Sequence, residues 1–170
     1  MYDAIFKIVI FGDAGCGKTA LTKRFITDMF IPETQMTIGV EFEIKSMEID
    51  DQMVKLQIWD FGGEERFRFL LPKYIRGASG GVLMYDITNY SSLFHVDDWL
   101  SVIKENEEDF PIILVGGKSD LEQDRQVSKE EGLKIAYSRG INNFIECSSK
   151  TGENIEEIFK QLTENLLKKI

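Results

Sequence analysis

A glycine-rich segment near the amino terminus has the residue types that bind phosphate. The segment Gly12-Asp13-Ala14-Gly15-Cys16-Gly17-Lys18-Thr19 fits the pattern of glycine, any four residues, glycine, lysine, and serine or threonine. Glycines let backbone N–H groups approach phosphate oxygens without an intervening Cβ, and a helix that begins near Lys18 adds the positive end of its dipole. We therefore expect residues 13–19 to bind phosphate; the alternative is a glycine-rich turn that binds nothing.

The last two residues of this segment indicate which ligand it would take. Lys18 can reach the β- and γ-phosphates as a point charge, and the hydroxyl of Thr19 can ligate Mg²⁺. A nucleoside triphosphate with Mg²⁺ is therefore the implied ligand. The segment leaves open whether the base is adenine or guanine, and whether the γ-phosphoryl group is transferred to water or to a substrate.

Hydrophobic patterning predicts the sheet that positions this segment. Apolar runs at 4–11, 81–85 and 111–115 are typical of parallel strands buried on both faces. Residues 40–49 alternate in hydropathy and precede a turn signal and a second run at 53–59, which predicts a hairpin with one antiparallel edge strand. We expect an α/β fold with a mixed sheet of about six strands, mostly parallel.

Helices are predicted between and after these strands. Apolar residues recur at helical spacing over 93–103 and 155–166, each forming one stripe that covers the sheet. We expect about five flanking helices and a single domain over residues 1–170. The predicted N-caps of the last three helices are Ser91 or Ser92, Ser128 with Glu131, and a residue between Thr151 and Glu153.

Composition excludes several classes of function. The 170 residues carry a net charge of −9, which disfavours binding to a nucleic-acid backbone. No apolar run approaches the roughly 18–20 residues that span a bilayer, and no secretory signal is evident. The chain has 2 cysteines, Cys16 and Cys147, whose placement does not resemble a disulfide framework. We expect a cytoplasmic protein.

Four further segments, in order, resemble the motifs of Ras-superfamily small GTPases, and most of all the Rab branch. They are Thr37-Ile38-Gly39-Val40-Glu41-Phe42, residues 55–67, Gly117-Lys118-Ser119-Asp120, and Cys147-Ser148-Ser149-Lys150-Thr151-Gly152. The resemblance implies a P-loop NTPase G domain that binds GTP and GDP with Mg²⁺ and hydrolyses GTP. It also implies that effector, exchange-factor and GTPase-activating proteins contact residues about 30–40 and 61–76. Phe61-Gly62-Gly63 resembles the Arf and Gα version of its motif.

The resemblance assigns a role to each matching residue. Lys18, Gly63 and Glu64 would be catalytic, and Gly63 and Thr37 would contact the γ-phosphate. Mg²⁺ would be held by Thr19 and Thr37, and by Asp60 through water. Guanine would be bound by Phe30, Gly117, Lys118, Asp120, Ser149 and Lys150. A carboxylate accepts both N–H groups on the guanine edge, so Asp120 is expected to select the base. A core position is the alternative for Phe30.

Two positions depart from the family pattern. Glu64 stands where glutamine usually orients the attacking water, and Gly117 stands where the guanine motif usually begins with asparagine. Losing the asparagine hydrogen bonds is expected to weaken nucleotide binding by roughly tenfold to a hundredfold, so Gly117→Asn is expected to slow GDP release. Three functions stay open: a regulatory GTPase, a GTP-binding interaction module with little hydrolysis, and a P-loop kinase.

A few other residues carry weaker signals. Cys16 is interpreted as a small residue that fits its loop, with a redox-sensitive thiol as the alternative. His95, the only histidine, has no nucleophile or metal-ligand companion in the sequence and is predicted to lie on the surface. Trp59 and Trp99 are predicted to lie in the core or an interface. No terminal cysteine or glycine signals lipidation, so we expect no intrinsic membrane anchor; membrane association would require a lipidated tail beyond residue 170.

Replacing Glu64 by glutamine is predicted to accelerate GTP hydrolysis. A carboxylate accepts hydrogen bonds but cannot donate one unless it is protonated, and at about 5 Å from a phosphate charge it meets a repulsion of roughly 3 kcal/mol at an effective dielectric of about 20. Single-turnover hydrolysis measures the effect, with Glu65→Gln as the neighbouring control. Equal rates for the natural protein and Glu64→Gln, both at the usual family rate, would contradict the prediction.

Overall fold

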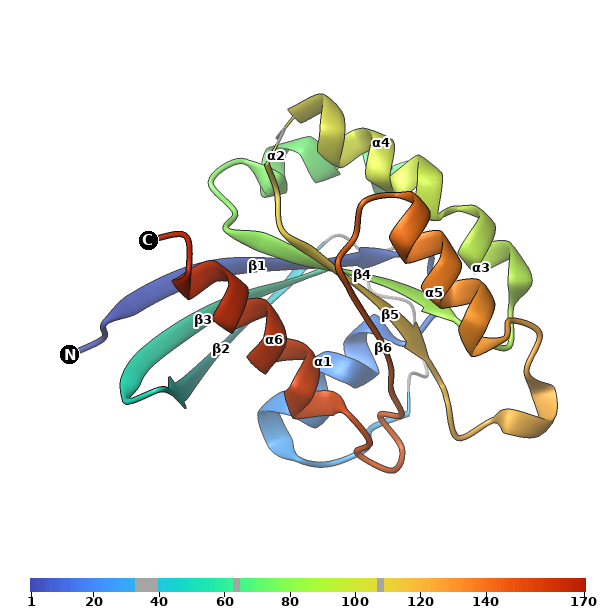
Figure 1. The fold of residues 1–170 in the computed structure, drawn as a ribbon, viewed down its shortest axis with the longest axis horizontal. Helices are drawn as coiled ribbons and strands as arrows, with labels where there is room; N and C mark the ends of the chain where they lie inside the picture. Colours follow the sequence, from blue (N-terminus) through green and yellow to red (C-terminus); the bar gives the residue numbers. More distant parts are fainter. Residues whose placement is uncertain (33–39, 63–64, 107–108) are drawn as a thin grey trace.

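The computed structural model describes residues 1–32, 40–62, 65–106 and 109–170, and within these residues one mixed sheet organises the chain (Figure 1). The strand order is β2-β3-β1-β4-β5-β6. The strands are β1 (Ala4–Gly12), β2 (Val40–Ile49), β3 (Gln52–Phe61), β4 (Gly80–Asp86), β5 (Ile112–Gly117) and β6 (Asn143–Glu146). The predicted six-stranded sheet with parallel strands at its centre is therefore confirmed.

The single antiparallel pair is the predicted hairpin. Strand β2 pairs with β3 in a register that places Val40 opposite Phe61 and Ile49 opposite Gln52. Asp50 and Asp51 form the turn with positive φ angles of 49° and 63°, a conformation that aspartate tolerates better than most residues. All other pairs are parallel, from β3–β1 through β5–β6.

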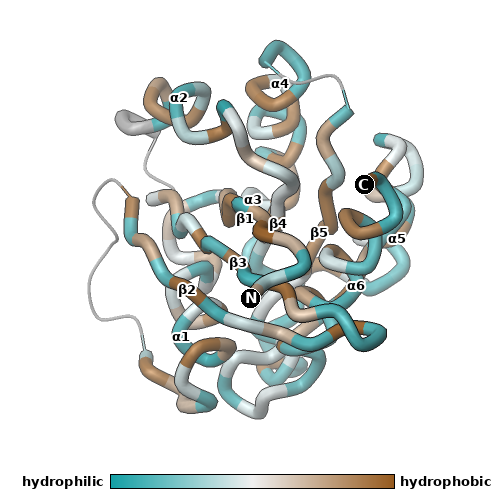
Figure 2. Tube along the Cα trace, turned by 90° about the vertical axis from the view of Figure 1, so that its left-hand side faces the viewer, coloured by the Kyte–Doolittle hydropathy of each residue, from teal (hydrophilic) through white to brown (hydrophobic). Residues whose placement is uncertain are grey.

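Helices cover both faces of the sheet. They are α1 (Lys18–Thr27), α2 (Leu71–Ile75), α3 (Tyr90–Phe94), α4 (Val96–Asn106), α5 (Lys129–Ser138) and α6 (Ile155–Leu167), with 3₁₀ turns η1 (Glu65–Leu70) and η2 (Glu122–Asp124). Helices α1 and α6 pack on one face, and α2 to α5 pack on the other. In Figure 2, β5 is mainly hydrophobic whereas α4 alternates, as expected for a buried strand and an amphipathic helix.

The structure corrects two predicted helix starts. The N-cap before α3 is Asn89, whose side chain accepts a hydrogen bond from the Ser91 backbone N–H, rather than Ser91 or Ser92. Helix α6 starts after Asn154, which adopts a left-handed conformation without a side-chain cap, rather than within residues 151–153. Ser128 and Glu131 form the predicted capping box. The pattern over 93–103 predicts one helix, and the structure divides this region into α3 and α4 at His95.

Within the described ranges, no helix is both long enough and apolar enough to cross a bilayer.

The carboxyl ends of the parallel strands carry the loops that hold the predicted site residues, as is general in open α/β sheets. An ion pair joins two of these loops behind the site. The guanidinium of Arg125, after η2, donates to both carboxylate oxygens of Glu146 at 2.7 and 2.9 Å. Glu146 is the last residue of β6, so the pair ties the segment after β5 to the segment after β6. These hydrogen bonds raise the pKa of the Arg125 guanidinium.

Arg125→Met is predicted to destabilise the fold. It leaves the Glu146 carboxylate, which is 8% exposed, without its cation, and breaking a buried pair in this way costs about 3 kcal/mol. Arg139→Met is the matched control, because the Arg139–Asp97 pair is exposed and such pairs contribute less than about 1 kcal/mol. Urea denaturation measures both free energies of unfolding, and equal losses would contradict the prediction.

Candidate functional site

The predicted phosphate loop connects β1 to α1 and has the backbone that its glycines allow. Gly15 and Gly17 have φ angles of 78° and 102°, in the left-handed region that disfavours side chains. Gly17 is the N-cap of α1, which begins at Lys18 as predicted, and its first turn contains no acidic residue. The positive end of the helix dipole therefore faces the loop, an arrangement suited to an anion.

Lys18 and Thr19 of α1 each form a hydrogen bond with another predicted site residue. Lys18 is only 4% exposed, and its ammonium group donates to the backbone carbonyl of Asp13 at 2.7 Å. The hydroxyl of Thr19 donates to Oδ2 of Asp60 at 2.5 Å. Asp60 is buried near the end of β3, so the structure brings together the two described residues that the sequence predicts as metal ligands.

Thr19 and Asp60 suit a Mg²⁺ ion that takes most of its other oxygen ligands from a bound phosphate and from water. Thr19 and Asp60 offer a hydroxyl and a carboxylate oxygen, the hard oxygen donors that Mg²⁺ prefers. Among the residues that the structure describes, no three His, Cys, Asp or Glu side chains gather into a metal-binding group. This pattern suits Mg²⁺, which usually keeps waters and takes oxygens from substrate phosphates instead of a full protein cage.

The loop after β5 lies beside the phosphate loop. Lys118, with a positive φ of 66°, donates from its ammonium group to the carbonyl of Gly15 at 2.8 Å and pairs with Oδ2 of Asp86 at 2.8 Å. Asp120 accepts a hydrogen bond from the Ser148 hydroxyl at 2.8 Å, which links it to the loop after β6. The three loops thus form one surface.

A cavity of about 410 Å³ opens between these loops. Phe30 lies at its edge with 39% of its surface exposed, so the core interpretation of Phe30 is wrong. The cavity is lined by Gly15, Gly17, Ala20, Phe30, Pro32, Met84, Lys118, Asp120, Leu121, Ser149 and Lys150. It therefore contains residues from both the phosphate loop and the predicted guanine-binding segments, which are separated by about a hundred residues of sequence.

The structure does not place every predicted site residue at this cavity. Thr37, Gly63 and Glu64 fall outside the described residues. Gly117 is buried at the end of β5, behind the cavity wall. The side chain of Asp13 points away from the loop towards α4, so Asp13 offers this loop its backbone and not its carboxylate.

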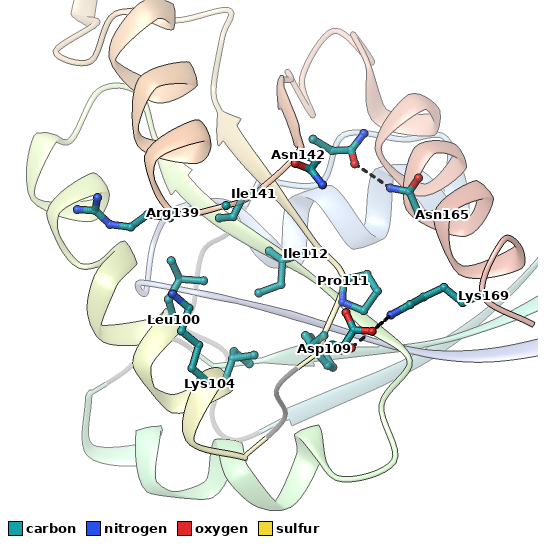
Figure 3. Close-up of a pocket in the computed structure, with 14 residues that line it drawn as sticks. Leu100, Lys104, Asp109, Pro111, Ile112, Arg139, Ile141, Asn142, Asn165 and Lys169 are labelled. Carbon is teal, nitrogen blue, oxygen red and sulfur yellow. Dashed lines mark hydrogen bonds and ion pairs between the residues drawn. The ribbon is translucent and has the colours of Figure 1, made fainter.

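Another cavity, of about 460 Å³, lies between α4, the start of β5 and the carboxyl-terminal part of α6 (Figure 3). It contains none of the predicted site residues. Two of its cationic side chains are already paired, Arg139 with Asp97 and Lys169 with Asp109. We therefore assign the candidate site to the smaller cavity.

Comparison with known proteins identifies the family. The Ras family profile matches residues 7–168. The chain is 43% identical over 170 residues to Ras-related protein Rab-8B of Homo sapiens, covering 99% of this chain and 82% of that protein. It is 43% identical over 162 residues to Ras-related protein SEC4 of Candida albicans, covering 95% and 77% of the two chains. The chain belongs to the Ras family.

As a Rab-like member of the Ras superfamily, the protein is a GTP-binding GTPase that acts as a switch. The similarity to Rab-13 of Canis lupus familiaris, at 40% identity over 169 residues, spans 99% of this chain and 83% of that protein. Regulator and effector proteins are therefore expected partners in general terms.

A partly exposed aromatic cluster adjoins the predicted partner segments of this Rab-like GTPase. The Phe42 and Trp59 rings are 4.7 Å apart across the β2–β3 hairpin, and Tyr74 of α2 lies 5.8 Å from Trp59. Phe42 is 44% exposed. The sequence-based partner ranges missed Phe42, although its alternation with Ile44 and its register opposite Trp59 in a hairpin could have indicated it.

The structure also reveals a contact that the sequence reasoning missed. Asp13 accepts a hydrogen bond from the indole N–H of Trp99 at 2.9 Å, and its other carboxylate oxygen lies 2.5 Å from Nδ1 of His95. His95 is exposed, as predicted, and its contact with Asp13 joins residues 82 positions apart that meet only in the folded chain. The contact anchors the start of the phosphate loop to the junction of α3 and α4.

The two cysteines are structural. Cys16 is 1% exposed, and its thiol donates to the carbonyl of Met84 at 3.5 Å, which favours packing over redox chemistry. Burial raises the pKa of the Cys147 thiol to about 12, so this thiol stays protonated at neutral pH.

Trp99→Phe and Asp13→Ala are predicted to be energetically coupled. Phenylalanine cannot donate to the Asp13 carboxylate, and a hydrogen bond to a charged group contributes about 2 kcal/mol. A double-mutant cycle by urea denaturation, at one fixed nucleotide concentration, measures the coupling energy. Trp59→Phe is the control partner, because its indole N–H has no hydrogen-bond acceptor among the described residues. Additive effects of Trp99→Phe and Asp13→Ala would contradict the assignment.

Proposed function

We propose that the 410 Å³ cavity binds GTP and GDP and that residues 1–170 form one G domain. The observation that carries the proposal is the shared lining of the cavity, in which phosphate-loop residues meet Lys118, Asp120, Ser149 and Lys150. A phosphate chain and a purine are bound at opposite ends of a nucleotide, so a site for the whole ligand needs both groups of residues together. The sheet that runs through the described residues supports a single domain.

The phosphate end is handled by backbone N–H groups and one cation. The ammonium group of Lys18 exchanges its hydrogen bond with the Asp13 carbonyl for phosphate oxygens when nucleotide binds. Thr19 and Asp60 would hold Mg²⁺ in place of their mutual hydrogen bond, with Asp60 acting through water. When bound, Mg²⁺ would supply positive charge that stabilises the phosphates during phosphoryl transfer. Thr37 and Gly63 are the proposed γ-phosphate contacts.

Asp120 selects which base binds at the other end of the cavity. Its carboxylate accepts the two N–H groups on the guanine edge, while the hydrogen bond from Ser148 fixes its orientation. Adenine lacks that pair of donors. The alkyl stem of Lys118 covers one face of the base and Phe30 lies at the cavity edge, with Ser149 and Lys150 contributing their backbone to the base O6.

The second candidate is a GTP-binding module that hydrolyses little GTP, and Glu64 is the observation that favours it. A carboxylate in place of an amide holds water only as an acceptor and is repelled by the γ-phosphate, so hydrolysis is slow. Both candidates share the same nucleotide site. They differ in whether a GTPase-activating partner accelerates GTP hydrolysis enough to switch the protein to its GDP state.

Partner proteins are proposed to contact residues about 30–40 and 61–76, together with the aromatic cluster of Phe42, Trp59 and Tyr74. Segments that contact the γ-phosphate change when it is lost, and the adjoining aromatic cluster supplies apolar area for binding. The partner therefore distinguishes the GTP and GDP states by these two segments, while the aromatic cluster that adjoins them supplies apolar contact area.

Nucleotide identification tests the proposal directly. Mass spectrometry after gentle denaturation of the purified protein is expected to find GDP or GTP, and timed conversion of added GTP to GDP, with and without a cell extract, separates the two candidates. Recovery of an adenine nucleotide, or of no nucleotide combined with no binding of added GDP, would overturn the proposed function.

Asp120→Asn is predicted to shift base preference from guanine to xanthine. Asparagine presents one acceptor and one donor, which opposes the amino group of guanine but matches the C2 carbonyl of xanthine. The GDP affinity is expected to fall by about tenfold to a hundredfold while the affinity for xanthosine diphosphate rises. Competition binding measures both. Asp124→Asn is the matched control, because Asp124 is exposed in η2 and does not line the cavity; an unchanged preference in Asp120→Asn would contradict the role.

A further inference from the structure

Met84, in the middle of the sheet, contacts both halves of the nucleotide cavity. Its backbone carbonyl accepts the Cys16 thiol hydrogen bond at 3.5 Å. A Cβ placed on Gly12 would lie 2.2 Å from that same carbonyl oxygen, so the start of the phosphate loop lies directly against β4. The main chain of Met84 is thus a fixed support for the phosphate loop.

The side chain of Met84 extends from this support to the base loop. Its Cε methyl lies 2.3 Å from the position that a Cβ on Gly117 would occupy, and 3.4 Å from the corresponding position on Gly17. The residue is 1% exposed and lines the 410 Å³ cavity. The methyl group therefore occupies space that a side chain at residue 117 would need.

The chemistry at this point of the cavity is apolar. A thioether donates no hydrogen bond and accepts only weakly, so it positions its neighbours by packing and not by polar contacts. Lys118 continues from Gly117 into the cavity, and Asp120 follows two residues later. The Met84 methyl therefore packs directly against Gly117, the residue that precedes both predicted base contacts.

We propose that Met84 and Gly117 act as one unit that sets the spacing between the phosphate loop and residues 118–120, and thereby the rate at which guanine nucleotide dissociates. Met84 is a positioning residue, because it acts through the two loops that it separates. This inference rests on the proposed function of the cavity, and it adds a residue that no motif of the sequence includes.

The proposal reverses one expectation from sequence. Asparagine at 117 alone is expected from the motif to slow GDP release, yet its Cβ overlaps the Met84 methyl and lies 3.2 Å from the Cys16 carbonyl. The Met84 methyl is the far end of a flexible side chain and must move aside, and the Cys16 carbonyl, which is backbone, must shift by a few tenths of an ångström. We therefore expect the side chain introduced by Gly117→Asn to form its hydrogen bonds only when Met84 is also replaced by a shorter residue.

A double-mutant cycle tests the unit with fluorescently labelled GDP. Gly117→Asn and Met84→Val are each expected to speed dissociation of the labelled GDP into excess unlabelled GDP by about tenfold, the first by overlap and the second by leaving a void. The double variant is expected to dissociate at least about tenfold more slowly than Gly117→Asn. Gly117→Ala, with and without Met84→Val, repeats the cycle with the Cβ alone in case asparagine prevents folding.

Two controls separate positioning from general stability. Met47→Val shortens a partly buried methionine of β2 that does not line the cavity, and it is expected to leave the dissociation rate unchanged. The ratio of affinities for GDP and inosine diphosphate reports the Asp120 contact, because the two bases differ only in the amino group. Gly117→Asn is expected to reduce this ratio, and the double variant to restore it.

The outcomes are distinguishable. Additive effects in both cycles, or a base ratio that stays constant across the variants, would overturn the role of Met84 while leaving nucleotide binding intact. Failure of the natural protein to bind labelled GDP would instead overturn the proposed function on which the inference rests.

Discussion

The close approach of the phosphate loop to β4 is the contact on which the nucleotide cavity depends. Gly12 has no Cβ where one would lie 2.2 Å from the Met84 carbonyl, and Cys16 donates to that same carbonyl. A larger residue at Gly12 would push the loop off the sheet, because the obstacle is backbone and cannot rotate away. Gly17 and Gly117 then leave room for the Met84 side chain between the phosphate and base loops. Packing at the sheet therefore sets the dimensions of the site.

Local charge at the cavity opposes the global charge of the chain. The net charge is −9, yet Lys18 and Lys118 direct their ammonium groups towards the phosphate loop, where the amino-terminal end of α1 adds its dipole. Both cations are held by backbone carbonyls of that loop, Asp13 and Gly15, and Lys118 also pairs with Asp86. Exposed charges beyond about 8 Å are largely screened at physiological ionic strength. The net negative charge of the chain is therefore compatible with the proposed binding of one compact anion at this site.

Secondary structure could be predicted from sequence wherever a repeating hydrophobic pattern specified it. The prediction was wrong where the start of a helix depended on a single capping residue. The buried strands and the β2–β3 hairpin were predicted because continuous and alternating hydrophobicity identify them. The N-caps before α3 and α6 were not, because serine, threonine, aspartate and asparagine compete locally and the backbone entering the helix selects among them. Asn89 caps α3 directly after a turn in which Asp86 accepts a hydrogen bond from the Thr88 backbone N–H.

The sequence by itself determined the family, the sheet and the phosphate loop, because the requirements of that loop are met within eight consecutive residues, 12–19. Tertiary structure alone decided which distant residues support it. Asp13 meets Trp99 across 86 positions, and Met84 meets Gly117 through adjacent strands β4 and β5. No local pattern encodes these contacts, since they depend on which strands become neighbours and how closely they pack. The sequence thus identifies the groups proposed to contact a nucleotide, and the fold decides how they are supported.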